Sequence, residues 1–367
     1  MNHSIILGMD IGGANTKLAL LKFLNSKLET SYSHLEYFPF WEKTLNDIPT
    51  MLKRVLSKIT KKAKVKIKDI NYFSITITAE LSDAFKTKKE GISIILNALG
   101  QVLDQEKLRF ISNNGDFLAF EEAKNNFASI AGANWFSTSL FLGKFISKCI
   151  LIDAGSTTID IIPILDGIPV TEGKNDIERL MNHELIYTGG LRATLPSITH
   201  FVPYKGSMIR ISFEKFALVS DIHRILYNIS EDEYINDTAD KRSKSIEDCY
   251  ARLARIICID SDTISKDELN NIAKNIYQKQ IELISTEIQQ FLTDLISRIP
   301  EYKDDITFVI TGIAAEFLIR RALSHLGYKN ISIYEELTGI SDSISSSAFA
   351  VAGALYFDLS KRVKNDD

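Results

Sequence analysis

Two short stretches of sequence decide the fold: Asp10-Ile-Gly-Gly-Ala-Asn-Thr-Lys17 and Asp153-Ala-Gly-Ser-Thr-Thr-Ile-Asp160. In each stretch an acidic residue ends an apolar run, a glycine follows, and a second apolar run comes after the polar residues. Such runs suit strands that are buried on both faces, and the glycine allows a tight turn between them. The second stretch lies far downstream of the first, so we predict two copies of a strand–turn–strand unit.

Both turns have the residue types that bind phosphate. Successive backbone N–H groups in such a turn form a concave anion site, and the acid at the strand end can hold a divalent cation directly or through water. An Asp-x-Gly turn can also join two strands for backbone reasons alone, but the second copy favours a binding role. We therefore expect Mg²⁺ at Asp10 and Asp153. The residues expected to contact phosphate are Gly12, Gly13, Asn15, Thr16, Lys17, Gly155, Ser156, Thr157 and Thr158.

A third glycine turn occurs in Val309-Ile-Thr-Gly-Ile-Ala-Ala-Glu316. The pattern predicts a strand that runs into a helix over 312–326 through Gly312, which would aim helix N–H groups at a ligand. A plain strand-to-helix turn is the alternative interpretation. We add Gly312 to the expected phosphate-binding residues.

Hydrophobic periodicity along the rest of the chain predicts an α/β protein with two domains. The first domain is expected to span 1–148 and 340–367, and the second 149–339 with an insertion at about 167–262. A helix is predicted over 117–131, and one long helix from Ser265 to Ile299, because apolar residues recur there at spacings of three, four and eight. This apolar stripe consists of Leu269, Ile272, Ile276, Ile284, Ile288, Phe291, Leu295 and Ile299.

The composition excludes several classes of protein. Of the 367 residues, 45% are hydrophobic and 25% charged, which argues against disorder, and the net charge of −4 predicts neither a nucleic-acid nor a membrane partner. The three cysteines form no C-x-x-C pair, which argues against a disulfide scaffold or a structural zinc site. No apolar run approaches the roughly 20 residues that span a bilayer. We expect a cytoplasmic protein, and the long helix could pack against that of a second copy in a homodimer.

The order of two Asp-Gly hairpins, a Thr-Gly strand-to-helix turn and an alanine-rich closing helix resembles the superfamily of actin, Hsp70 and sugar kinases. This resemblance implies two ribonuclease-H-like domains that face a central cleft. Within the superfamily, the stretch from Asp153 to Asp160 is similar to the second phosphate hairpin of the hydantoinase/oxoprolinase branch.

Further strings, spread over nearly the whole chain, resemble the short archaeal and methylotroph members of this branch, which are linked to tetrahydromethanopterin-dependent C1 metabolism and make methanofuran. The chain departs from their pattern at Ala79, where a glycine is expected, and at Gly190, where a bulkier residue is expected. The strings are Thr78-Ala-Glu-Leu-Ser-Asp83, Ala133-Asn-Trp135, Glu184-Leu-Ile-Tyr-Thr-Gly189 with Arg192, Asp237-Thr-Ala-Asp240 and Ala251-Arg-Leu-Ala-Arg255.

The resemblance implies a transferase of methanofuran biosynthesis with two small-molecule substrates. It would join an aminomethylfuran-methyl diphosphate to γ-glutamyltyramine, form an aryl ether and release pyrophosphate. Negative charge develops on the leaving diphosphate, so the catalysis should be mainly electrostatic, with Asp10, Lys17 and Asp153 at the reacting groups. ATP binding in place of the diphosphate substrate is less favoured.

The phenol needs a base, because its unperturbed pKa is near 10. Glu80 and Asp83 both follow the strand that ends at Thr78, and either could take the proton or simply cap the next turn. The choice between them stays open.

The second substrate should contact residues of the remaining strings. Trp135, next to Asn134, could face the furan through its π surface or belong to the core. Arg192, near Thr188 and Gly189, could bind a carboxylate bidentately or form a salt bridge elsewhere. Glu316 could orient the second substrate or begin its helix, and His183 is interpreted as structural.

Two other classes of function compete with the transferase. An ATP-dependent small-molecule kinase or a hydantoinase/oxoprolinase-like enzyme would use the same hairpins for ATP. A nucleotide-switched protein that is not an enzyme is the second alternative. ATP turnover without the furan and phenol substrates would favour these classes.

Overall fold

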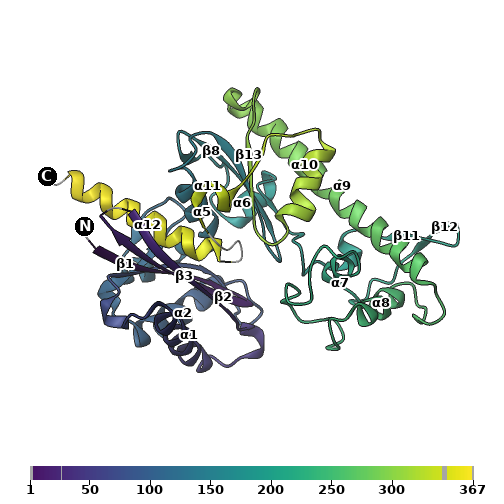
Figure 1. Cartoon of the computed structure of the whole chain (residues 1–367), viewed down its shortest axis with the longest axis horizontal. Coiled ribbons are helices and arrows are strands. Elements are labelled where there is room, and N and C mark those ends of the chain that lie inside the picture. Colours follow the sequence, from purple (N-terminus) through teal and green to yellow (C-terminus); the bar gives the residue numbers. More distant parts are fainter. Residues whose placement is uncertain (1–2, 26, 341–344, 366–367) are drawn as a thin grey trace. The chain divides into compact units, whose positions relative to one another are not determined.

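The computed structural model describes residues 3–25, 27–340 and 345–365, which form two compact units (Figure 1). Unit 1 consists of Met1–Cys149, Ile162–Glu178 and Tyr334–Asp367, and unit 2 of Ile150–Ile161 and Arg179–Ile333. The predicted boundaries near 149 and 340 lie close to this division, but the segment Ile162–Glu178 belongs to unit 1. Its attachment is local: a Cβ atom on Gly143 would lie 2.0 Å from the carbonyl oxygen of Gly167, so the two backbones are in direct contact.

The sheet of unit 1 has the order β3-β2-β1-β4-β5-β6. The hairpins β1–β2 and β2–β3 are antiparallel, whereas β4 runs parallel to β1 and β5 parallel to β4. The carboxyl ends of β1 and β4 therefore meet at one edge of the sheet. The strands are β1 (His3–Gly12), β2 (Asn15–Leu24), β3 (Lys27–Tyr37), β4 (Tyr72–Thr78), β5 (Leu108–Ile111) and β6 (Phe117–Leu118).

Helices cover both faces of this sheet, with α1 and α2 on one face and α12 on the other (Figure 1). The first two pack their apolar sides onto the sheet and enclose the main core of unit 1. At Gly8 the close-packed α12 leaves no room for a side chain, because a Cβ atom there would lie 1.9 Å from the carbonyl oxygen of Ala348. The helices of unit 1 are α1 (Asp47–Ala63), α2 (Lys88–Val102), α3 (Phe120–Asn125), α4 (Phe127–Ile130), α5 (Asn134–Leu142), α11 (Tyr334–Thr338) and α12 (Ser346–Asn365).

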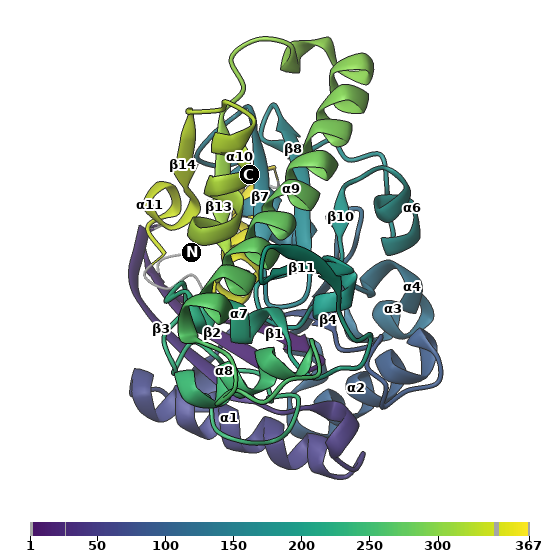
Figure 2. The ribbon, with the colours of Figure 1, turned by 90° about the vertical axis from the view of Figure 1, so that its right-hand side faces the viewer.

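Unit 2 repeats this topology with a sheet of order β10-β8-β7-β13-β14 (Figure 2). Here β13 is parallel to both β7 and β14, and β10 is antiparallel to β8. The predicted duplication of the strand–turn–strand unit is thus confirmed by the strand order. The strands of this sheet are β7 (Cys149–Ala154), β8 (Ile159–Leu165), β10 (Leu185–Ile186), β13 (Phe308–Thr311) and β14 (Ile331–Ile333). From Ile162 onward, β8 and the neighbouring β9 (Ile168–Pro169) belong to the segment that is grouped with unit 1.

A separate core in unit 2 lies among α7, α8, α9 and the hairpin β11–β12. At its centre the fully buried Arg252 pairs with the fully buried Asp221 at 2.8 Å and with Asp240 at 3.1 Å. Two of the strings quoted for the family resemblance therefore supply a buried ion-pair network. The elements are α7 (Val219–Ile225), α8 (Ile246–Arg255), α9 (Lys266–Arg298), α10 (Arg320–His325), β11 (Phe201–Tyr204) and β12 (Ser207–Arg210).

The long helix α9 confirms the prediction for 265–299, with Ser265 as the N-cap that accepts a hydrogen bond from the Glu268 N–H. Two other predicted helices are wrong in extent. The region 117–131 begins with a short strand and contains two helices, because the backbone at Asn126 leaves the helical region. The region 312–326 begins with a π-helical turn at Ala315–Ile319, and α10 follows it.

Two further findings on the described residues concern the cysteines and membrane-spanning helices. Cys149 and Cys249 are buried and Cys258 is exposed, and all three are free thiols. None of the helices in the described ranges is both long enough and apolar enough to cross a membrane.

Candidate active site

The turn between β1 and β2 lies beside the carboxyl end of β4 in unit 1. Gly12 is paired with Thr78 in the parallel register, so the residues that follow Thr78 emerge next to the turn. The carboxyl ends of the strands are the edge at which open α/β sheets generally bind ligands. Glu80, two residues beyond Thr78, lies at the same edge.

Asp10 and Lys17 face each other across β1 and β2, and the Lys17 ammonium lies 3.4 Å from the Asp10 carboxylate. The Ser347 hydroxyl donates to the same carboxylate at 2.6 Å. Asp10 is buried, whereas the Lys17 side chain keeps 31% of its exposure. The two predicted residues are thus brought together as an ion pair, and Lys17 still reaches the solvent, where a phosphate would arrive.

Glu80 is a buried carboxyl group at this edge of unit 1. It is 2% exposed, and its Oε2 atom has no hydrogen-bond partner among the described residues. Burial raises the pKa of Glu80 to about 7; Asp176 and Asp10 add to the increase, while its own backbone N–H and Lys88 oppose it. A carboxyl group with a pKa near neutrality is suited to accept a proton at physiological pH. Asp83, the other predicted base, is exposed.

Asp176 and Lys88 lie close to Glu80 and were not predicted from the sequence. The Lys88 ammonium is 2.8 Å from the Asp176 carboxylate. A Cβ atom placed on Gly132 would lie 3.5 Å from Asp176 Oδ1 and 3.7 Å from Glu80 Oε1, so both carboxyl groups border one small space. Gly132 also has a φ of +61°, and its N–H donates to the Ile77 carbonyl, which keeps this segment at the carboxyl edge.

The second turn, residues 155–158 between β7 and β8, is held from behind by a loop of unit 2. The N–H groups of Gly189 and Gly190 donate to the carbonyls of Thr157 and Gly155, each at 2.9 Å. The N–H groups of Leu191 and Arg192 both donate to the Ser156 carbonyl at 3.0 Å. Three successive carbonyls of the turn therefore point toward one loop.

The N–H groups of this turn point the other way, because the C=O and the following N–H of a trans peptide are antiparallel. These N–H groups belong to Ser156, Thr157 and Thr158, and within the described residues none of the three has an acceptor. All three residues are partly exposed. These three N–H groups form a row of donors, and successive backbone N–H groups of this kind are typical of anion sites.

The glycines of the two turns and of the loop behind the second turn fall into two groups: those that packing requires and those that it does not. A Cβ atom on Gly189 would lie 2.6 Å from the Thr157 nitrogen, so Gly189 is required by packing. A Cβ atom on Gly13 or Gly155 would meet nothing closer than 3.7 Å or 3.5 Å within its own unit, and neither residue has a positive φ. Neither the backbone conformation nor packing within the unit demands glycine at Gly13 and Gly155, and their contact with phosphate stays a prediction.

Gly312 joins the second turn through the backbone. Thr311 is paired with Asp153, and a Cβ atom on Gly312 would lie 2.4 Å from the Ala154 carbonyl oxygen and 2.7 Å from Asp153 Oδ1. With a φ of +91°, the position accepts glycine alone without strain. Backbone conformation and packing therefore require glycine at position 312, and its contact with phosphate stays a prediction.

The residues at the two strand ends fit Mg²⁺ only as a largely hydrated ion. The Asp10 carboxylate already accepts from Ser347, and the Thr78 hydroxyl lies 3.5 Å from it. Within the described residues no group of three or more His, Cys, Asp or Glu side chains converges as metal ligands. One carboxylate, with water and phosphate oxygens for the rest, is the usual coordination of Mg²⁺ in proteins.

Several other predicted residues lie away from solvent or serve the scaffold. Trp135 is 3% exposed and its ring packs against Phe136 at 5.1 Å, while the neighbouring Asn134 is partly exposed. Thr16 is fully buried, unlike the other polar residues of its turn. Roles for Trp135 and Asn134 toward a furan, and for Thr16 toward phosphate, stay predictions.

The predicted substrate residues of unit 2 differ in their surroundings. Thr188 and Gly189 are buried behind the turn, Arg192 is partly exposed beside it, and Glu316 is exposed and paired with Arg320 at 2.7 Å. Arg320 holds the pKa of Glu316 below its usual range. His183 is 2.7 Å from Glu287 and has a φ of +57°, in agreement with its structural interpretation.

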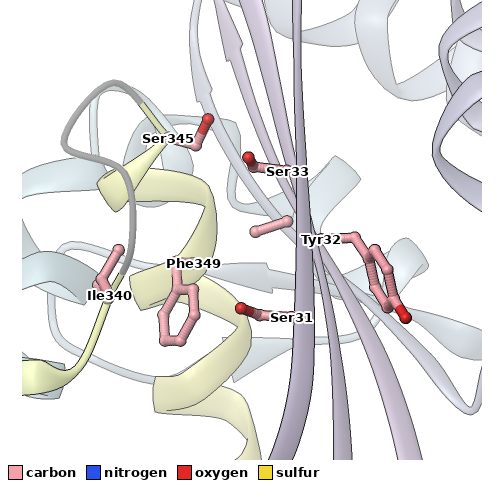
Figure 3. Close-up of a pocket in the computed structure, with 7 residues that line it drawn as sticks. Ser31, Tyr32, Ser33, Ile340, Ser345 and Phe349 are labelled. Atoms are coloured by element: carbon pink, nitrogen blue, oxygen red, sulfur yellow. The ribbon is translucent and has the colours of Figure 1, made fainter. Parts of the chain in front are cut away.

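A pocket of unit 1 lies between β3 and α12, away from the predicted catalytic residues (Figure 3). In Figure 3 the side chains of Ser31, Ser33 and Phe349 face the pocket, whereas the ring of Tyr32 lies on the other side of the strand. None of the residues predicted to bind phosphate or to act as a base lines it. The chemistry of the site therefore rests on the strand ends and not on this pocket.

Two residues missed by the sequence analysis support the second turn. Gln280 of α9 donates from its amide to the Thr188 hydroxyl and to the Gly189 carbonyl, each at 3.2 Å. His223 of α7 contacts Gln280 in turn. The signal for Gln280 was present in the sequence, since it occupies the middle of the eight-residue gap between Ile276 and Ile284 in the apolar stripe.

Comparison with known proteins identifies the family of the chain. The hydantoinase/oxoprolinase family model matches residues 71–356. A protein of Methanocaldococcus jannaschii, named (4-{4-[2-(gamma-L-glutamylamino)ethyl]phenoxymethyl}furan-2-yl)methanamine synthase, is 37% identical over 97% of this chain and 99% of its own length. A Methanococcus vannielii protein of the same name is 36% identical over 61% of this chain and 98% of its own length.

A nucleotide-free structure of acetone carboxylase shares the fold, with a TM-score of 0.52 at 11% identity over 95% of this chain and 70% of that chain. Together with the two sheets, this similarity confirms the predicted two-domain α/β fold of the actin/Hsp70/sugar-kinase type. The predicted family is also confirmed, since the family model and the first relative both cover most of the chain. The chain belongs to the hydantoinase/oxoprolinase family, in the group that contains the two archaeal synthases.

Proposed function

We propose that this protein is a transferase that joins the furfuryl carbon of an aminomethylfuran-methyl diphosphate to the phenol oxygen of γ-glutamyltyramine. The product is an aryl ether, and pyrophosphate is released. The names of the two archaeal relatives support this reaction, at 37% and 36% identity. The structural observation that carries it is the buried Glu80, whose pKa of about 7 suits a base for a phenol.

The reaction is a single nucleophilic substitution at the furfuryl carbon, in which one bond to that carbon forms and one breaks. Ionised Glu80 accepts the phenol proton, the phenol oxygen forms a bond to the furfuryl CH₂, and the bond from that CH₂ to the diphosphate oxygen breaks. The electron pair of the broken bond leaves with pyrophosphate. Because Glu80 must be ionised to act, the rate should rise as the pH increases through about 7.

The leaving group requires stabilisation of the charge that develops on its bridging oxygen. The three N–H groups of Ser156, Thr157 and Thr158 are available for anion oxygens, and the partly exposed Lys17 can supply a positive charge. When bound through Asp10 or Asp153, Mg²⁺ would neutralise part of the diphosphate charge.

The test is an assay of pyrophosphate release by the full chain with Mg²⁺. We expect release only when the furan diphosphate and γ-glutamyltyramine are both present. A matched control is γ-glutamyl-O-methyltyramine, which has no phenolic proton to lose and should give no product. ATP should not be converted to ADP at a comparable rate.

Sustained conversion of ATP to ADP without the two substrates would contradict the transferase and favour a kinase, a hydantoinase-like enzyme or a nucleotide-switched protein. Equal release of pyrophosphate with and without γ-glutamyltyramine would reduce the activity to hydrolysis of the diphosphate. Omission of Mg²⁺ tests the proposed cofactor in the same assay.

The finer parts of the proposal follow from the same resemblance. They place the reaction in methanofuran biosynthesis and C1 metabolism, in the cytoplasm, and allow a homodimer formed through α9. Light scattering of the purified chain measures the oligomeric state directly.

A further inference from the structure

Gln280 is a polar residue in the apolar face of α9. It is 1% exposed, and the positions four residues before and after it, Ile276 and Ile284, are fully buried. An amide in such a place costs free energy unless its donors and acceptor are all satisfied. All of them are satisfied here: the amide nitrogen donates to Thr188 Oγ1 and to the Gly189 carbonyl, and the amide oxygen contacts His223.

The orientation of Gln280 is fixed by its partners. A carbonyl only accepts, so the Gly189 oxygen requires the amide nitrogen on its side, and Oε1 must then face His223 Nε2 at 3.1 Å. The Asn228 amide donates to His223 Nδ1 at 3.1 Å, so the proton of the neutral imidazole is on Nε2 and is donated to Gln280. Burial lowers the pKa of His223 to about 3, which keeps this tautomer neutral throughout the physiological range.

His223 also connects this amide to the third glycine turn. Its ring lies 4.5 Å from that of Phe317 and 5.6 Å from that of Tyr277. Phe317 belongs to the π-helical turn Ala315–Ile319, and the Tyr277 hydroxyl donates to its carbonyl. A Cβ atom on Gly190 would lie 3.3 Å from the Phe317 ring, so the loop and the π-helical turn are packed together.

Gln280 holds the loop 189–192, and this loop in turn holds the turn 155–158, called the anion turn below. Gly189 accepts from Gln280 through its carbonyl and donates its N–H to Thr157, and Gly190 donates to Gly155. Any shift of the loop therefore moves the turn carbonyls and, with them, the free N–H groups on the opposite side. Since an array of donors acts on an anion only when it is aligned in advance, the loop controls anion affinity.

We propose that Gln280, oriented by His223, is a positioning residue that aligns the N–H groups of Ser156, Thr157 and Thr158 for the diphosphate of the substrate. Neither residue touches the ligand; they act through Thr188 and Gly189. The inference rests on the proposed function only for the identity of the substrate. The expectation that the turn 155–158 binds an anion comes from its hydrogen bonds.

The first experiment measures the binding of inorganic pyrophosphate, with Mg²⁺ present, to the full chain by titration calorimetry. Gln280→Met keeps the volume and apolar surroundings but removes three hydrogen bonds, and we expect its affinity to fall about 10-fold or more. Gln290→Met is the matched control, because Gln290 is an exposed residue of the same helix, and it should bind as the wild type does. His223→Phe keeps the ring packing, loses the donor to Gln280, and should weaken binding about 3-fold or more.

A second measurement separates positioning from a merely structural role. In Gln280→Glu, a protonated carboxyl group can donate to the Gly189 carbonyl, whereas the ionised form repels it. The affinity of this variant should therefore fall as the pH rises from 5.5 to 8.5, relative to Gln290→Glu over the same range. A pH-independent ratio of the two affinities would overturn the proposal.

Wild-type affinity in a folded Gln280→Met would also overturn it, as would a wild-type chain that does not bind pyrophosphate. If Gln280→Met does not fold, His223→Phe and the pH dependence of Gln280→Glu decide the matter. Failure of the transferase reaction leaves these binding results intact, so loss of pyrophosphate affinity without any aryl ether formation contradicts the proposed function alone.

Discussion

The two glycine turns begin with the same sequence pattern but are supported in different ways. In unit 1 the strand-end acid Asp10 is neutralised by Lys17 and held by Ser347, and the Gly13 and Ala14 carbonyls accept from the backbone of the segment after β3. In unit 2 four backbone N–H groups from the loop 189–192 hold the turn carbonyls. The first turn thus combines an ion pair with two backbone hydrogen bonds, whereas the carbonyls of the second turn accept four backbone hydrogen bonds.

This difference shows that the same hairpin topology can be supported by different groups. The charged edge of unit 1 also contains the buried Glu80, so it is suited to proton transfer. The turn of unit 2 has three backbone N–H groups, those of Ser156, Thr157 and Thr158, without an acceptor among the described residues. The shared sequence motif predicts the same hairpin topology in both units, whereas the groups packed around each turn determine its electrostatics.

The largest expected effect comes from Glu80→Gln, which tests the charged edge. Loss of a general base should reduce turnover about 10²–10⁴-fold, while the binding of pyrophosphate stays near the wild-type value. Glu106→Gln, at an exposed position of the same unit, is the control and should leave turnover unchanged.

The same variant has a predicted effect on stability. The folded state holds the pKa of Glu80 near 7, above its unfolded value, so stability from this group is present at low pH and is lost as the pH rises to about 7. Glu80→Gln should therefore become more stable than the wild type between pH 4 and 7, by on the order of 2–3 kcal/mol at the upper end. Denaturant unfolding across this range measures the difference. A parallel pH dependence in both proteins would show that Glu80 titrates normally.

A smaller effect distinguishes Gly155 of the second turn from Gly189 of the loop behind it. Gly155→Ala meets no atom of unit 2 closer than 3.5 Å, so the thermal midpoint should hardly change while turnover falls about 10-fold through contact with the diphosphate. Gly189→Ala would place its methyl group 2.6 Å from backbone atoms, and it should lose about 1–3 kcal/mol of stability. If both variants are equally destabilised, the separation into ligand-facing and packing glycines is wrong.

The smallest expected effect is a displacement of the pH profile by the neighbours of Glu80. Asp176→Asn removes a negative charge and should move the acid limb of the rate profile to lower pH, whereas Lys88→Met removes a positive charge and should move it to higher pH. Each shift should be under about one pH unit, because both side chains are partly exposed. Shifts in the same direction for both variants would exclude a shared electrostatic influence on Glu80.

Much of the site could be predicted because its residues lie at strand ends. A buried strand that ends in an acid and a glycine can be recognised in the sequence, so the sequence predicts that Asp10 and Asp153 lie near the ends of their strands, as they do in β1 and β7. Glu80 was found for the same reason, as it follows Thr78 at the end of β4. Its preference over Asp83 was not predictable, because burial depends on which helices cover the strand end.

The sequence by itself determined the duplicated hairpins, the long amphipathic helix and the family, because periodicity and turn residues are local properties of the chain. The tertiary structure alone decided that Thr188 and Gly189 support the turn from behind, that Gln280 and His223 hold them, and that Asp176 and Lys88 lie beside Glu80. The reason is that hydrogen bonds and Coulomb interactions act over a few ångströms in space, whereas Gln280 and Thr188, for example, are separated by 92 residues along the chain.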